Sequence, residues 1–161
     1  MEPAALSLPP APNLDHQLCF AVYSAGLAFN RVYRRPLQRL RLTYPQYLVM
    51  LALWGEDRIT VGRLGERLSL DSSTLTPLLK RLEAAGLVAR SRSDADERRV
   101  VLSLTAKGRE LRGEADEVTR CIVAATGMPE TEILRLTNEI RALRASLEQA
   151  AAVADNEQRC G

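Results

Sequence analysis

Apolar residues recur at alternating spacings of four and three from residue 14 to residue 40 of the sequence. The positions are Leu14, Leu18, Val22, Ala25, Phe29, Val32, Pro36 and Leu40. This spacing predicts one long amphipathic helix, with either Asn13 or Asp15 as its cap.

Two more helices are predicted after residue 104. Thr105 caps the first, which runs toward Gly127, and Pro129 opens the second. The second carries a stripe at spacings of three and four, made of Ile133, Leu136, Ile140, Leu143 and Leu147. The first predicted helix and these last two are long for so small a globule, and their apolar stripes need a surface to cover them. We therefore expect helices at about 14–41 and 105–153 to bury them in a two-fold homodimer.

Shorter elements are predicted between these outer helices. Thr43 begins a capping-box pattern that starts a helix ending near Gly55. Thr60 can cap a third helix, and Asp71 a fourth that stops at Gly86. Two short helices joined by a tight turn are typical of a helix-turn-helix.

A β-hairpin is predicted directly after this helix pair. Residues 87–92 and 99–104 are strand-like, and the six residues between them are polar and turn-forming. The fold class is thus mainly α with a small β-hairpin wing, a winged helix-turn-helix. We expect it to span about residues 44–104 within a single domain of residues 14–161.

Composition limits the class of protein. The 161 residues are 46% hydrophobic, which fits one compact domain. Residues 1–13 hold four prolines and no Lys or Arg, so we interpret them as a mobile arm and not as a secretory signal. No apolar run approaches the roughly 18 residues that span a bilayer, which predicts a soluble, cytoplasmic protein without a membrane partner.

Positive charge is concentrated in the second half of the winged-helix region. Residues 80–112 hold nine Lys or Arg and five Asp or Glu, a local charge of +4 in a chain whose total is +2. A basic region of this kind favours contact with a nucleic acid.

The candidate DNA-binding residues lie on the fourth helix and the wing. Short polar groups at the start of the helix suit base edges, and long cations suit phosphates and the minor groove. The helix supplies Ser72, Ser73, Thr74, Thr76, Lys80 and Arg81, and the wing supplies Arg90, Arg92, Arg98 and Arg99. Asp96 is placed to orient Arg98. The alternative is that the hydroxyls merely cap the helix and the cations form a solvated face.

The stretch of residues 71–108 resembles the MarR family of regulators. It contains D-S-S-T-L-T-P-L-L-K-R-L-E, then D-A-D-E-R-R and L-T-A-K-G, and the D-x-R wing motif falls on Asp96-Glu97-Arg98. The resemblance extends over about residues 14–150. It implies a winged-helix homodimer that binds double-stranded operator DNA.

Cys19 is a candidate redox-active residue. It is expected in the second turn of the first helix, where the helix dipole favours a thiolate. A thiolate that attacks a peroxide becomes a sulfenic acid, which a second thiol captures as a disulfide. Tyr23, Tyr33 and Tyr44 carry hydroxyls that can donate to a thiolate. The alternatives are a small buried cysteine and ordinary aromatic packing.

The surroundings of Cys19 resemble the organic hydroperoxide resistance regulators within the MarR family. The matching segments are L-C-F-A-V-Y around Cys19, V-Y at Tyr33 and L-T-Y-P-Q-Y around Tyr44. The resemblance implies that an organic hydroperoxide oxidises Cys19, that Tyr33 and Tyr44 bond to it in the reduced form, and that oxidation releases the DNA. It also implies Cys121 as a resolving cysteine between subunits, with Cys160 or a small-molecule thiol as alternatives.

Two other functions stay open at this point. Many MarR-like proteins respond to phenolic or aromatic carboxylate ligands, and a thiol peroxidase that binds DNA is a further alternative to a non-enzymatic sensor. One histidine and three distant cysteines supply no metal-binding cluster, so no metal or other cofactor is expected.

Overall fold

The computed structural model of the chain describes residues 13–92 and 98–159. The chain forms two compact units, Met1–Thr119 and Arg120–Gly161. The fold is mainly helical with one small antiparallel sheet, which confirms the predicted class. The proposed arm lies outside the described residues except for Asn13, as do residues 93–97 of the expected wing tip. Among the described residues, no helix is both long and apolar enough to cross a membrane.

The beginning of the first helix differs from the prediction. Leu14–His16 form a short 3-10 turn, η1, whose cap is Asn13. Gln17 is extended, and α1 therefore begins later and spans Leu18–Leu40. Cys19 thus lies in the first turn of α1 and not in the second, because the apolar spacing continues across a break that it does not reveal.

Helix α2 (Tyr44–Gly55) confirms the predicted capping box. The Thr43 amide donates to Gln46 Oε1 at 2.8 Å, and the Gln46 amide donates to Thr43 Oγ1 at 3.5 Å. Two reciprocal bonds satisfy amides that would otherwise lack partners at the helix start. Tyr47 of this helix is 1% exposed. The inward face of α2 forms the centre of the winged-helix core.

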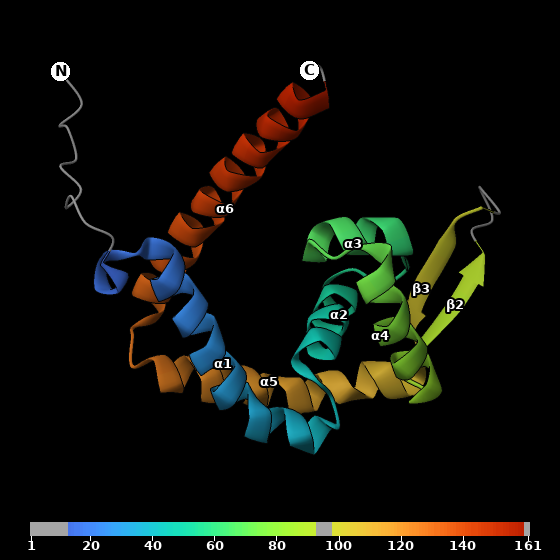
Figure 1. Cartoon of the computed structure of the whole chain (residues 1–161). Helices are drawn as coiled ribbons and strands as arrows, with labels where there is room; N and C mark the ends of the chain where they lie inside the picture. The colour runs from blue at the N-terminus through green and yellow to red at the C-terminus, as the bar shows by residue number, and fades with distance from the viewer. Residues whose placement is uncertain (1–12, 93–97, 160–161) are drawn as a thin grey trace. The chain divides into compact units, whose positions relative to one another are not determined.

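The predicted helix-turn-helix is formed by α3 (Val61–Leu68) and α4 (Ser72–Ala84). Thr60 and Asp71 cap them as expected, because each side-chain oxygen accepts a hydrogen bond from an amide of the first turn. Both helices lie against α2, and the wing projects to one side (Figure 1). The turn between them is tight, since a Cβ on Gly65 would lie 2.9 Å from the carbonyl oxygen of Leu70.

The wing contains one strand more than predicted. β2 (Val88–Arg92) and β3 (Val100–Leu104) pair antiparallel as expected. A further strand, β1 (Ile59–Thr60), pairs with the other side of β3, so the order is β1-β3-β2. A strand of two residues is too short to show an alternating pattern, so β1 could not be predicted from the sequence.

One hydrophobic core joins these elements. The large side chains with less than 2% exposure are Tyr47, Val49, Met50, Leu53, Ile59, Leu64, Leu75, Leu79, Leu82, Val88 and Leu102. Members come from α2, α3, α4 and all three strands of the sheet. The base of the wing is therefore held against α4 by packing within one chain.

The start of α5 (Ala106–Thr126) is tied to α2 and to the end of α4 by hydrogen bonds. Trp54 Nε1 donates to the Gly108 carbonyl at 2.8 Å, and Lys107 Nζ donates to the Ala85 carbonyl at 2.8 Å. Thr105 caps α5 as predicted, accepting from the Gly108 amide at 3.0 Å. Glycine is needed at position 108, because a Cβ there would lie 2.1 Å from the Leu87 carbonyl oxygen.

Within the second unit, α6 spans Glu130–Arg159. It is longer than the predicted helix, which ended at about residue 153. Several large apolar residues of α6 are exposed in the single chain: Leu134, Leu136, Ile140, Leu147 and Val153. Members of the predicted stripe thus remain uncovered within this chain.

Candidate functional site

Hydroxyl groups cluster around the amino-terminal end of α4. Ser73 Oγ and Thr74 Oγ1 both donate to the Asp71 carboxylate, and Thr76 Oγ1 donates to the Ser72 carbonyl at 2.7 Å. The Ser73 hydroxyl and the Thr74 amide hold the pKa of Asp71 below its ordinary value. All five residues are exposed, so Asp71 caps the helix while the hydroxyls, bonded to Asp71 or to the helix backbone, still lie at the surface.

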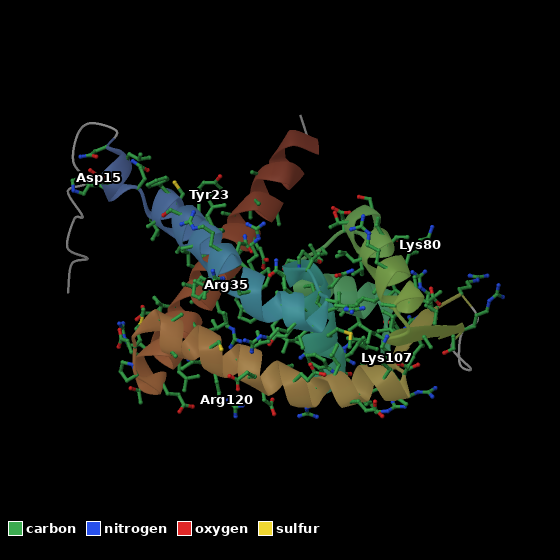
Figure 2. All side chains as sticks on the ribbon, turned by 90° about the horizontal axis from the view of Figure 1, so that it is seen from below. Asp15, Tyr23, Arg35, Lys80, Lys107 and Arg120 are labelled. Carbon is green, nitrogen blue, oxygen red and sulfur yellow. The ribbon has the colours of Figure 1, made fainter. Side chains whose placement is uncertain are left out.

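Cations continue this exposed surface along α4 and the wing. Lys80 and Arg81 are exposed on α4, where Figure 2 labels Lys80. Arg92, at the end of β2, and the pair Arg98 and Arg99, just before β3, are exposed as well. The expected partner of Arg98, Asp96, lies outside the described residues.

Arg90 differs from the other cations of the wing. Its side chain is 27% exposed, and its Nε lies 3.3 Å from Glu83 Oε2 on α4. Nε and Nη2 are buried from solvent and have no hydrogen-bond partner among the described residues. The contact with Glu83 is therefore an ion pair whose angles do not make a hydrogen bond. Sequence reasoning missed Glu83, although its charge and its place at the end of α4 were visible.

Cys19 lies near the amino-terminal end of α1 with an exposed side chain. The positive end of a helix dipole favours negative charge in this first turn. Tyr23, one turn further on, is 64% exposed and is labelled in Figure 2. In the single chain, Cys19 is therefore not a small buried cysteine, and Tyr23 is not an aromatic residue of the core.

The other two candidate tyrosines pack against each other with tilted rings. The ring centroids of Tyr33 and Tyr44 lie 4.7 Å apart, and that of Tyr47 lies 5.9 Å from Tyr33. Burial, followed by the charges of Tyr44 and Tyr47, raises the pKa of Tyr33 to about 12. Burial, followed by Tyr47, raises the pKa of Tyr44. Both phenols therefore stay protonated near neutral pH and keep a hydrogen to donate.

One chain does not bring Cys19 and Tyr33 together. Fourteen residues of α1 separate them, which corresponds to about 21 Å along a helix that rises 1.5 Å per residue. Their directions around the helix differ by roughly 40°, because each residue turns the helix by 100°. They therefore share a face of α1, with Cys19 in its first turn and Tyr33 about two turns before its end.

That face of α1 is unusually apolar for an exposed surface. Val22, Tyr23 and Phe29 are exposed on it, and the exposed Leu18, Phe20, Leu27 and Val32 extend the apolar surface around the helix. In contrast, Leu37 and Leu40 at the other end of α1 are buried. A contiguous apolar surface of this kind marks an interaction site.

The remaining cysteines belong to the second unit. Cys121 is exposed on α5, and Cys160 lies outside the described residues. Within the part of the chain that the structure describes, no group of three His, Cys, Asp or Glu side chains is placed to hold a metal ion.

A helix-turn-helix followed by an antiparallel wing defines the class of winged-helix proteins. Residues 31–114 match the family described as transcriptional regulator SarA/Rot. The chain belongs to this family of MarR-like winged-helix transcriptional regulators.

Proteins of similar sequence are transcriptional regulators as well. The chain is 50% identical over 139 residues to the HTH-type transcriptional regulator TtmR of Methylorubrum extorquens, covering 86% of this chain and 71% of TtmR. It is 40% identical over 137 residues to the organic hydroperoxide resistance transcriptional regulator of Bacillus subtilis, covering 85% and 93%.

Solved structures of AbfR share the fold. The structure of reduced AbfR bound to DNA has 36% identity and a TM-score of 0.70, and the match covers 84% of this chain and 93% of AbfR. A structure of disulfide-formed AbfR matches with 35% identity and a TM-score of 0.59, covering 81% and 91%. AbfR is a protein of Staphylococcus epidermidis.

Proposed function

We propose that this regulator is a homodimeric, DNA-binding repressor that senses organic hydroperoxides by oxidation of Cys19. The observation that carries the proposal is the arrangement on α1. An exposed thiol lies at one end of an uncovered apolar face, and the protonated Tyr33, which packs against Tyr44 of α2, lies about 21 Å along the helix at the other. An antiparallel second copy of α1 would bring each thiol to the other copy's tyrosines.

Binding to operator DNA is supported by the exposed surface of α4 and the wing. The hydroxyls at the start of α4 suit base edges in the major groove, and Lys80, Arg81 and Arg92 suit phosphates. Arg98 and Arg99 lie beside the wing tip, from which a guanidinium reaches a minor groove. The similar AbfR has been solved on DNA in its reduced form.

A homodimer is supported by the apolar faces of α1 and α6. Each carries large hydrophobic side chains that the single chain leaves in water. Self-association about a two-fold axis covers the same face on both copies, so it buries the apolar surfaces of both at once. The proposed dimerisation helices are α1, α5 and α6, at the two ends of the chain.

The proposed chemistry requires one cysteine and one peroxide. The Cys19 thiolate attacks an oxygen of the hydroperoxide, the O–O bond breaks, and the organic fragment leaves as an alcohol after taking up a proton. Cys19 becomes a sulfenic acid. Tyr33 and Tyr44 of the second copy donate hydrogen bonds to the thiolate before the reaction, and Tyr23 lies beside it.

The sulfenic acid is then resolved by a second thiol. We assign this role to Cys121, whose sulfur attacks the Cys19 sulfur, forms a disulfide and releases water. The new bond between subunits would shift the outer helices and release the DNA. The protein reacts once per signal, and we therefore classify it as a sensor and not as a peroxidase.

Fluorescence anisotropy of the reduced protein on the DNA upstream of its own gene tests the proposal. We expect tight binding that is lost after about one equivalent of cumene hydroperoxide per subunit, the amount that one thiol consumes. Cys19→Ser should bind DNA and ignore the peroxide. Cys121→Ser should still respond, but dithiothreitol should fail to restore DNA binding once its sulfenic acid has been oxidised further.

The alternatives give different results in the same experiment. Release of DNA by a phenolic or aromatic carboxylate ligand, with an intact response in Cys19→Ser, would support a ligand-responsive regulator. Repeated turnover of peroxide with a reductant would support a thiol peroxidase. Unchanged DNA binding after peroxide treatment would contradict the redox proposal.

A further inference from the structure

The strand β2 places Arg90 on the inner face of the wing. Alternate residues of a strand point to opposite faces, so Arg90 shares its face with Val88, which is 2% exposed. Its cross-strand neighbour is Leu102, which is fully buried. Ala89 and Ser91 occupy the other face and are exposed. Arg90 therefore points toward α4 and the core.

The charge of Glu83 explains why an arginine is tolerated there. Glu83 lies in the last turn of α4, where the helix dipole already presents negative charge and disfavours a carboxylate. The Arg90 guanidinium, 3.3 Å away, neutralises it. In turn, Glu83 offsets the charge of a guanidinium whose Nε and Nη2 are buried without a hydrogen bond among the described residues. Removing either charge leaves the other uncompensated.

The pair also joins the two elements that must engage DNA together. Glu83 belongs to α4, the proposed reader of the major groove, and Arg90 belongs to the strand that leads to Arg92 and the wing tip. The base of the wing is already held by the Leu87 amide, which donates to the Leu82 carbonyl at 3.0 Å. The ion pair adds a second link at Arg90, three residues beyond Leu87. This is about 10 Å further along the strand, because a strand rises about 3.3 Å per residue.

We infer that Arg90 is a positioning residue, which fixes the wing relative to α4 through Glu83 and does not itself contact DNA. The inference rests on the proposed DNA-binding function, and it revises the expectation that Arg90 is one of the DNA contacts. The orientation of the wing then decides whether the major-groove and minor-groove contacts form simultaneously.

The salt dependence of DNA binding distinguishes positioning from contact. Each lost phosphate contact lowers the slope of log K against log salt by about 0.9. Arg90→Met should weaken binding about fivefold with an unchanged slope, a factor within the range of coupled residue pairs. The matched control, Arg92→Met on the same strand, should weaken binding and also lower the slope by about 0.9.

For Glu83→Gln, positioning and simple electrostatics predict changes in DNA affinity in opposite directions. Removing a negative charge from a DNA-binding helix should strengthen binding by simple electrostatics. Positioning predicts the opposite, a loss of about fivefold, and a double variant with Arg90→Met that is no worse than either single variant. Tighter binding by Glu83→Gln, or a slope lowered by about 0.9 in Arg90→Met, would overturn the inference.

Hydrogen exchange of the free protein tests the pair without DNA. The backbone amides of Arg92 and Val101, near the outer end of the β2–β3 ladder, should exchange faster in Arg90→Met and Glu83→Gln than in the Arg92→Met control. Unchanged exchange in both variants would overturn the inference. If the wild-type protein bound no DNA, the proposed function would fail while this measurement still decided the role of the pair.

Discussion

The winged-helix module of residues 44–104 and the outer helices differ in how they bury their apolar side chains. In the module, Leu53, Leu64 and Leu82 are completely buried within one chain. In α1, Leu18 is 61% and Phe29 44% exposed. The module is thus stabilised by its own core, whereas the outer helices carry apolar surfaces that the single chain leaves exposed and that the proposed second copy would cover. The proposed sensor residue Cys19 lies on the exposed outer helix α1, and the proposed DNA contacts lie on the winged-helix module.

The largest effect is expected in the core of the module. Leu82→Ala should lower the free energy of unfolding by about 3 kcal/mol, because the lost side chain leaves a cavity under α4. Leu51→Ala on α2, a matched control at an exposed leucine, should cost less than about 1 kcal/mol. Urea unfolding measures both. Equal losses would show that the core of the module does not dominate its stability.

A smaller effect is expected on the apolar face of α1. Phe29→Ala should weaken dimerisation by about 2 kcal/mol, or about 30-fold, since roughly 1 kcal/mol of burial is lost from each of two symmetric copies. Sedimentation velocity over a range of concentrations measures the dissociation constant. Asn30→Ala, its exposed neighbour, serves as the control. An unchanged constant in Phe29→Ala would place the interface elsewhere.

The capping box at the start of α2 should contribute less to the free energy of unfolding than the core leucine does. Thr43→Ala removes a side-chain acceptor from the capping box and should lower the free energy of unfolding by about 1 kcal/mol. Thr43→Ser keeps the hydroxyl and should behave like wild type in the same thermal unfolding experiment. A loss of the same size in the serine variant would point to packing of the methyl group.

The last effect, confined to alkaline pH, is the dependence of stability on pH that Tyr33 causes. Its pKa is raised from 10.0 to about 12 in the folded protein, so the folded state holds the proton more tightly than the unfolded chain. The resulting stabilisation is fully present below pH 10 and is lost as the pH rises from 10 to about 12. Chemical unfolding across this range should show a shallower decline in Tyr33→Phe, and an equally steep decline would contradict the assignment.

Local chemistry made most of the module predictable from the sequence. The caps at Thr43, Thr60 and Asp71 were all found, because a cap depends on residues within one turn. The strand β1 was missed because its two residues acquire their conformation from pairing with the distant β3. The break at Gln17 was missed because the apolar spacing continues across it.

The candidate site was less predictable. Arg90 was grouped with exposed arginines by residue type, although its spacing of two from Val88 already indicated the inner face. Cys19 and Tyr33 were associated through the family resemblance, whereas their separation of about 21 Å follows only when α1 is an unbroken helix. Contacts between copies depend on a second chain, which periodicity within one sequence cannot place.

The most direct test of the central claim is the oxidation rate of a mixed dimer. One subunit carries Cys19→Ser, and its differently tagged partner carries Tyr33→Phe and Tyr44→Phe. If the thiol of one copy meets the tyrosines of the other, this dimer retains one complete site, and its single Cys19 should react with cumene hydroperoxide at the wild-type rate per thiol. A rate equal to that of the Tyr33→Phe, Tyr44→Phe homodimer would contradict the account, provided that this homodimer is slower than wild type. A homodimer as fast as wild type would contradict the proposed role of the tyrosines.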